Sequence, residues 1–196
     1  MEINKELLEK VRNFAYENEK TKRYEHSLRV AEFAGIMCRR YGIDWEKGYF
    51  AGLAHDICKE LDENSMILLA EKDGKPFTFT EKEKPSLLHG RAAAVVLRQK
   101  FNVQDEQVLQ AVSCHTLGEK NMCELAKIVY VSDKVEPGRP QSTAEYRQSL
   151  LEKNLDDALI EVVRENMKYL REKGRKIAPE SFDFYQGLLN ASEVKE

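Results

Sequence analysis

The sequence predicts an all-α protein, a bundle of roughly eight to ten helices. Apolar residues recur at helical spacing along nearly the whole chain, and no stretch of any length shows the alternation typical of a strand. Proline and glycine are sparse, at 5 and 10 of 196 residues. The length suits one domain with a sizeable core, so we expect a single domain over residues 1–196.

Residues with strong capping preferences mark the ends of the first helices. Asn4 and Asp44 are N-cap types, Thr21 is expected to cap the second helix, and Gly42 is suited to end it. The third helix is expected to continue to about Leu61. The other expected helix boundaries follow from where the apolar period stops and where Pro and Gly residues occur. The expected helices cover about 5–18, 22–42, 45–61, 65–73, 86–101, 105–115, 122–135, 144–151, 155–173 and 179–191.

Two irregular segments interrupt the helical pattern. Residues 73–85, DGKPFTFTEKEKP, form the longest one, and we expect a loop over one end of the bundle. Residues 136–143, EPGRPQST, form a Pro/Gly/Ser break. This break allows a subdomain boundary, but the helices after it are amphipathic and need an apolar surface to cover. We therefore expect a core of about 20–140 with the helices of 144–192 packed on it.

The charge balance excludes some classes of partner. Lys and Arg total 31 against 34 Asp and Glu, for a net charge of −3, so the basic footprint of a nucleic-acid binder is missing. No apolar run is long enough for a transmembrane helix, and the charged N-terminus lacks a signal-peptide core. We expect a cytoplasmic protein without membrane or nucleic-acid partners. An exposed helical face leaves a homodimer possible.

The four histidines of the chain are the strongest functional signal. Each histidine lies on its own expected helix, in register with the apolar stripe of that helix. Asp133 is also in register with the apolar stripe of its helix. A buried carboxylate is costly unless a cation pairs with it or a metal binds it. The four cysteines form no metal-binding spacing and are expected in the core. The candidate metal ligands are His26, His55, Asp56, His89, His115 and Asp133.

The mixture of imidazole and carboxylate narrows the choice of metal. Such ligands suit iron, manganese, zinc or nickel, and they do not suit calcium. The carboxylate of Asp56 has two oxygens and can bridge two ions at roughly 3.5–4 Å. With six ligands available, two divalent ions are possible, and ions held there would lower the pKa of bound water. A purely structural scaffold with hydrogen-bonded core histidines is the plainer alternative.

The order H…HD…H…H…D resembles the HD superfamily of metal-dependent phosphohydrolases. It is carried by RYEHSLRVAEFA, AGLAHDICKEL, PSLLHGRAAA, AVSCHTLG and KIVYVSDKVEPGR. Within that superfamily the chain is most similar to the bacterial YqeK family, over about residues 23–189. The resemblance implies an HD-domain helical bundle, the six ligands given above and a di-iron centre. It also implies symmetric hydrolysis of diadenosine tetraphosphate to two ADP. One departure is Arg91, where the family often has proline.

Three further residues are candidates for binding phosphate. Lys59 lies one helical turn after Asp56, and we expect both to act in catalysis. Arg139 lies on a rigid turn and has the guanidinium geometry for phosphate, and Thr116 follows His115. The plainer interpretations are a solvated Lys59, an Arg139 paired with a nearby glutamate, and a Thr116 that caps a helix end. Lys134 is expected to point away from the metals into solvent.

Other substrates and one other class of function remain open. The same metal site suits a nucleoside monophosphate, a guanosine polyphosphate or a cyclic dinucleotide, because such a centre sets the chemistry more than the substrate. A further hypothesis is a regulatory module that binds a nucleotide at an inactive site. The retention of all six ligands argues against it.

Overall fold

The computed structural model describes residues 3–193, and within that part of the chain all regular structure is helical. Two short 3₁₀ helices, η1 (Glu71–Asp73) and η2 (Pro85–Leu88), accompany the α-helices. Among these residues no helix combines the length and apolarity needed to cross a membrane. The α-helices are α1 Lys5–Asn18, α2 Thr21–Tyr41, α3 Trp45–Ala54, α4 Glu63–Ala70, α5 Phe79–Glu83, α6 His89–Lys100, α7 Glu106–Cys114, α8 Glu124–Val135, α9 Ala144–Glu152, α10 Leu155–Glu172 and α11 Pro179–Glu193.

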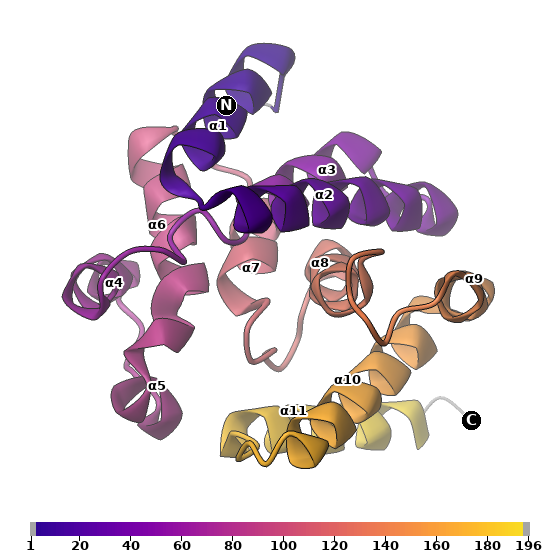
Figure 1. The fold of residues 1–196 in the computed structure, drawn as a ribbon. Helices are drawn as coiled ribbons and strands as arrows, with labels where there is room; N and C mark the ends of the chain where they lie inside the picture. The colour runs from indigo at the N-terminus through magenta and orange to yellow at the C-terminus, as the bar shows by residue number, and fades with distance from the viewer. Residues whose placement is uncertain (1–2, 194–196) are drawn as a thin grey trace.

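Helix α8 occupies the middle of the bundle. Its neighbours are α2 and α3 on one side, α7 on another and α10 on a third (Figure 1). The residues of α8 from Leu125 to Tyr130 are mostly buried apolar side chains, as this central position requires. Helices α6 and α7 pack in sequence beside α8, and α11 packs on α10 at the C-terminal end (Figure 1). The expected all-α class is confirmed.

Helices α2 and α3 form the tightest pair in the bundle. A Cβ atom on Gly52 would lie 2.7 Å from Ala31 Cα and 2.9 Å from Ala31 N, so only glycine permits this separation of the two backbones. Gly52 lies one turn before His55, and Ala31 lies further along the helix that carries His26. The close approach therefore brings two of the candidate ligands toward one another.

Several expected helix ends are confirmed. The side chains of Asn4 and Asp44 accept hydrogen bonds from the backbone amides of Leu7 and Glu46, as N-caps do. Gly42 ends α2 at a φ of 72°, in the left-handed region that glycine adopts without strain.

Two other expected helix ends are wrong. Thr21 is the first residue of α2 rather than its cap, and Lys20 stands at the N-cap without a side-chain bond. The fourth helix starts at Glu63, because Asp62 caps it by accepting from the amide of Ser65.

Helix α3 is shorter than the periodicity indicates. It ends at Ala54, and residues 55–60 form turns instead of continuing to Leu61. Neighbouring side chains on a helix point about 100° apart, whereas the turn lets His55 and Asp56 face the same interior point. Tertiary packing here overrides helix periodicity.

The segment 73–85 is only partly a loop. It contains α5, whose first turn is closed by a capping box in which Thr78 and Glu81 each bond the other's backbone amide. It ends in η2, so α6 starts at His89 rather than at Ser86. The capping-box signature Thr-x-x-Glu was present in the sequence and marks this helix.

Candidate metal centre

Six side chains from five parts of the fold meet in the interior. His26 comes from α2, His55 and Asp56 from the turns after α3, and the remaining three from α6, the end of α7 and α8. Each of the six is at most 8% exposed. Their ligand atoms form three overlapping groups, each within 4.8 Å. The groups are His26–His55–Asp56, His55–His115–Asp133 and Asp56–His89–His115.

Backbone carbonyls orient three of the four imidazoles. The Nδ1 atoms of His55, His89 and His115 lie 2.6, 2.7 and 2.7 Å from the carbonyl oxygens of the residues three positions earlier. A carbonyl oxygen only accepts, so each Nδ1 carries the proton and donates it. The lone pair of each ring is then on Nε2, which faces the centre of the cluster.

The inward-facing Nε2 atoms lie close to one another and to carboxylate oxygens, an arrangement that a cation would stabilise. His89 Nε2 and His115 Nε2 are 3.1 Å apart, so two lone pairs face each other. His55 Nε2 is buried without a hydrogen-bond partner and lies 3.7 Å from oxygens of both Asp56 and Asp133. An unpaired buried acceptor is costly. Imidazole and carboxylate donors in this arrangement fit divalent transition metals.

The protonation states of Asp56 and of three imidazoles also suit metal binding. Burial by itself would raise the pKa of Asp56, but attraction to the surrounding imidazoles, whenever they carry an extra proton, holds its pKa well below the ordinary value. Burial lowers the pKa of His55 to about 4 and also lowers the pKa values of His89 and His115. Ionised carboxylate and neutral imidazole are the forms that bind a metal.

Four cationic side chains contact the cluster. Arg23 Nη1 lies 2.7 Å from Asp56 Oδ2. Lys59 Nζ lies 3.2 Å from His89 Nε2, the ring nitrogen that carries the lone pair, so this candidate phosphate residue does reach the cluster. The other two cations, Arg139 and Lys134, bind Asp133.

The contacts of Asp133 correct one expectation and support another. Lys134 Nζ lies 2.7 Å from Asp133 Oδ2 and donates to the carbonyl of His115 at 2.7 Å, so it is not a solvated side chain. Its flexible four-carbon stem lets the ammonium group turn back toward the site although the adjacent residue faces inward. Arg139 Nη2 lies 2.7 Å from Asp133 Oδ1, which places the guanidinium at the cluster.

Two contacting residues were missed in the sequence. Arg23 precedes His26 by three positions, and Glu136 follows Asp133 by three. The first spacing puts both residues on one helix face, which is the signal that identifies Arg23. Glu136 Oε1 lies 3.0 Å from His26 Nδ1, so a carboxylate orients the one imidazole that no backbone carbonyl holds.

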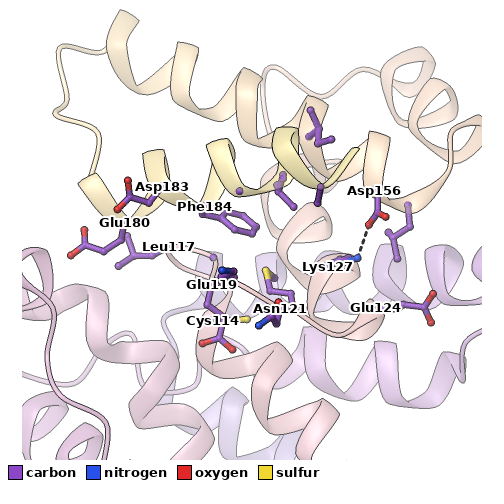
Figure 2. A pocket seen from close by; sticks show the side chains of 18 of the residues that line it. Cys114, Leu117, Glu119, Asn121, Glu124, Lys127, Asp156, Glu180, Asp183 and Phe184 are labelled. Carbon is purple, nitrogen blue, oxygen red and sulfur yellow. Dashed lines mark hydrogen bonds and ion pairs between the residues drawn. The ribbon is translucent and has the colours of Figure 1, made fainter. Parts of the chain in front are cut away.

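Thr116 and Arg91 are placed differently from the cluster residues. Thr116 lines a cleft of about 1550 Å³ between α11 and the loop after α7, and none of the six clustered residues lines that cleft. Figure 2 shows Phe184 reaching from α11 toward the loop of Leu117. Arg91 is buried and binds Asp73 through Nε and Nη2 at 2.7 Å each, so it fastens the 73–81 segment to α6.

The cysteines near the cluster behave as core residues. Burial raises the pKa of Cys58 to about 12 and raises that of Cys114 as well. Both thiols therefore stay protonated at neutral pH, which disfavours them as metal ligands. This matches the expectation that they are small buried hydrophobes.

Comparisons with known proteins agree with this geometry. A model of the HD domain family matches residues 23–138, a range that contains all six clustered residues. A Bacillus subtilis protein named "Bis(5'-nucleosyl)-tetraphosphatase, symmetrical" is 30% identical over 170 residues, covering 87% of this chain and 91% of that protein. A Halalkalibacterium halodurans protein of the same name is 33% identical, covering 85% of this chain and 89% of its own length.

A solved structure shares the fold. It is described as a predicted HD superfamily hydrolase involved in NAD metabolism from Clostridium acetobutylicum. The two chains superpose with a TM-score of 0.84 at 30% sequence identity, over 93% of this chain and 97% of the other. The similarity therefore includes the helices after residue 138 as well as the part matched by the family model.

Proposed function

The chain belongs to the HD domain family, and from that premise we propose that it is a metal-dependent enzyme that cleaves diadenosine tetraphosphate symmetrically into two ADP. The observation that carries the proposal is the set of buried Nε2 lone pairs and carboxylates that need a cation, in a chain similar to named tetraphosphatases over about nine-tenths of their length. We further propose that residues 1–196 act as one domain.

The ligands in this proposal are the six clustered residues, and the cofactor is a pair of divalent ions. Asp56, His55 and His115 each belong to two of the three ligand groups, so this set of residues would hold more than one ion. Iron is the proposed metal, with manganese, nickel and zinc as alternatives of the same ligand chemistry. Ions held there would polarise phosphate oxygens and lower the pKa of water toward neutrality.

The protein supplies charge and orientation for the substrate. Lys59 and Arg139 contact the cluster, and both would neutralise phosphate oxygens as negative charge develops on them. Arg139 is 37% exposed, so its guanidinium is accessible to a ligand. Thr116, which follows His115 in the chain and lines the cleft beside α11, is proposed as a weaker phosphate contact. ADP is a weakly basic leaving group, so the proposed reaction would not depend on a dedicated general acid.

The test is a product analysis with a matched control. Protein stripped of metal and reloaded anaerobically with Fe²⁺ would be incubated with diadenosine tetraphosphate, and the nucleotides would be separated. We expect ADP alone, and no product from the Asp56→Ala variant. Asp62→Ala removes a nearby aspartate that caps α4 outside the cluster, and it should retain turnover at a cost of about 1 kcal/mol in stability.

Each other outcome would change a specific part of the proposal. Formation of ATP and AMP would still indicate a metal-dependent hydrolase, but one that cleaves a different bond of the tetraphosphate. Turnover only of nucleoside monophosphates, guanosine polyphosphates or cyclic dinucleotides would replace the substrate. Tight ADP binding without any turnover would indicate a regulatory module. Location in the cytoplasm, a homodimeric state and the lack of a nucleic-acid partner remain predictions.

A further inference from the structure

His26 is held differently from the other three imidazoles of the cluster. His55 and His115 stand at the C-terminal ends of α3 and α7, and His89 is the first residue of α6. At such ends Nδ1 reaches the carbonyl three residues earlier, as all three do. His26 lies inside α2, where the backbone carbonyls bind helix amides. It therefore needs a side chain from elsewhere to orient its ring.

That side chain is Glu136, at the end of α8. The carboxylate is 2% exposed, and its Oε1 lies 3.0 Å from His26 Nδ1. Its other oxygen, Oε2, accepts from Arg29 Nε at 2.5 Å and from the backbone amide of Gly138 at 2.5 Å. Glu136 thus joins α2 to the turn after α8 through one buried group.

The same turn carries Arg139. The amide of Arg139 donates to the carbonyl of Glu136 at 2.9 Å, which closes the turn. Arg139 Nε then donates to the carbonyl of Asp133 at 2.9 Å, and Nη2 reaches Asp133 Oδ1. A Cβ on Gly138 would lie 2.5 Å from Arg29 Nε, so the arginine packs directly across this turn. The Glu136 carboxylate therefore shapes the turn that carries Arg139, through the bond that it accepts from the Gly138 amide.

We propose that Glu136 is a positioning residue that fixes the Nδ1–H tautomer of His26 and directs its Nε2 into the metal centre, while holding the turn that presents Arg139. This inference rests on the proposed function of the cluster. A carboxylate behind a ligating histidine fixes the ring and raises its basicity, and removing such a partner typically weakens metal binding tenfold to hundredfold. His26 belongs to only one of the three ligand groups, so removing Glu136 should weaken the binding of mainly one ion.

The experiment compares two partners of one ion pair. Glu136→Gln removes the carboxylate that holds His26, and Arg29→Met removes the arginine while leaving that carboxylate in place. Mn²⁺ affinity and stoichiometry would be measured by titration against a competing chelator, with circular dichroism to verify folding. We expect Glu136→Gln to bind one ion roughly tenfold to hundredfold more weakly and the other nearly as well as the wild type. Arg29→Met should bind both ions within threefold of the wild type.

A second measurement uses the wild type alone and stays valid if the glutamine variant does not fold. ¹⁵N-edited imidazole spectra of the Zn²⁺-loaded protein should show His26 with a proton on Nδ1 and none on Nε2, because in the metal-free protein Asp133 Oδ1 lies 3.1 Å from Nε2 and favours a proton there as well. The opposite tautomer would overturn the proposal, as would wild-type Mn²⁺ binding by Glu136→Gln. Equal losses in both variants would reduce Glu136 to a structural ion pair and also overturn it. If the wild type itself binds no divalent metal, the proposed function fails first.

Discussion

Replacing Gly90 by alanine tests whether the spacing of α6 and α7 sets the ligand geometry. A Cβ at this position would lie 2.9 Å from the carbonyl oxygens of Val112 and Ser113 and 3.0 Å from His115 Nδ1. Ordinary Cβ contacts begin at 3.4 Å, so the Cβ of alanine and the two carbonyl oxygens must move apart by about 0.5 Å. The two oxygens belong to the backbone of α7, and they recede only if the helices separate.

The expected magnitude follows from that separation. Overpacking a buried contact costs about 1–3 kcal/mol, whereas alanine in a helix gains about 1 kcal/mol over glycine. Gly187 in α11 provides the matched control, because a Cβ there meets nothing within 4 Å. Gly187→Ala should therefore stabilise the protein by up to about 1 kcal/mol. We expect the two variants to differ by about 1–3 kcal/mol, which isolates the contact from helix propensity.

The assay combines urea unfolding with metal titration. His89 precedes Gly90, and its Nε2 lies 3.1 Å from that of His115, so moving the helices apart spreads two ligands. Gly90→Ala should weaken Mn²⁺ binding by roughly tenfold or more, because ligands need placement within about 0.5 Å. Equal stability gains in both variants, together with unchanged Mn²⁺ affinity, would refute the reasoning.

Burial raises the pKa of Glu19 from 4.5 to about 7, so the folded state holds its proton more tightly than the unfolded chain. Stability from this group is present below pH 4.5 and is lost as the pH rises through 7, by up to about 3 kcal/mol. Urea unfolding of metal-free Glu19→Gln should therefore lack that decline, and parallel pH profiles for variant and wild type would contradict it. Lys134→Met leaves Asp133 Oδ2 without its cation and should lower the free energy of unfolding in urea by about 1.5–3 kcal/mol. Lys10→Met, at an exposed ion pair, is the control and should lower it by less than about 1 kcal/mol. Equal costs in these two variants would contradict the buried role of Lys134. Removing metal with a chelator should lower the melting temperature, since saturation at 100 times Kd contributes about 2.7 kcal/mol per site. An unchanged melting temperature in differential scanning fluorimetry would contradict metal binding at the cluster.

Local sequence features were sufficient where local chemistry controls the structure. Asn4 and Asp44 cap their helices as their side chains favour, and Gly42 ends α2 in the left-handed region. The helical period also placed His26, His89 and Asp133 on inward faces. These three residues replace apolar residues on helix faces that are buried anyway, whereas His55 and Asp56 lie in the turns after α3.

Local features failed where distant parts of the chain decide the conformation. The apolar period continues past Ala54, yet the chain turns at residues 55–60, and no local signal shows this. Lys134 was expected in solvent because its neighbour Asp133 faces inward, and its contact with the His115 carbonyl depends on how α7 meets α8. Arg91 departs from the family pattern, and its partners are acidic residues and carbonyls 10 to 18 positions away.

The sequence by itself determined the helical class of this protein and the residue types at the centre, because periodicity and the cost of burying charge are properties of each segment. Only the tertiary structure decided which nitrogen of His26 faces inward and that Arg23, Lys134 and Glu136 contact the ligands. Such contacts join residues as far as 110 positions apart. Their geometry depends on how closely whole helices pack, and packing distance is not encoded in any single segment.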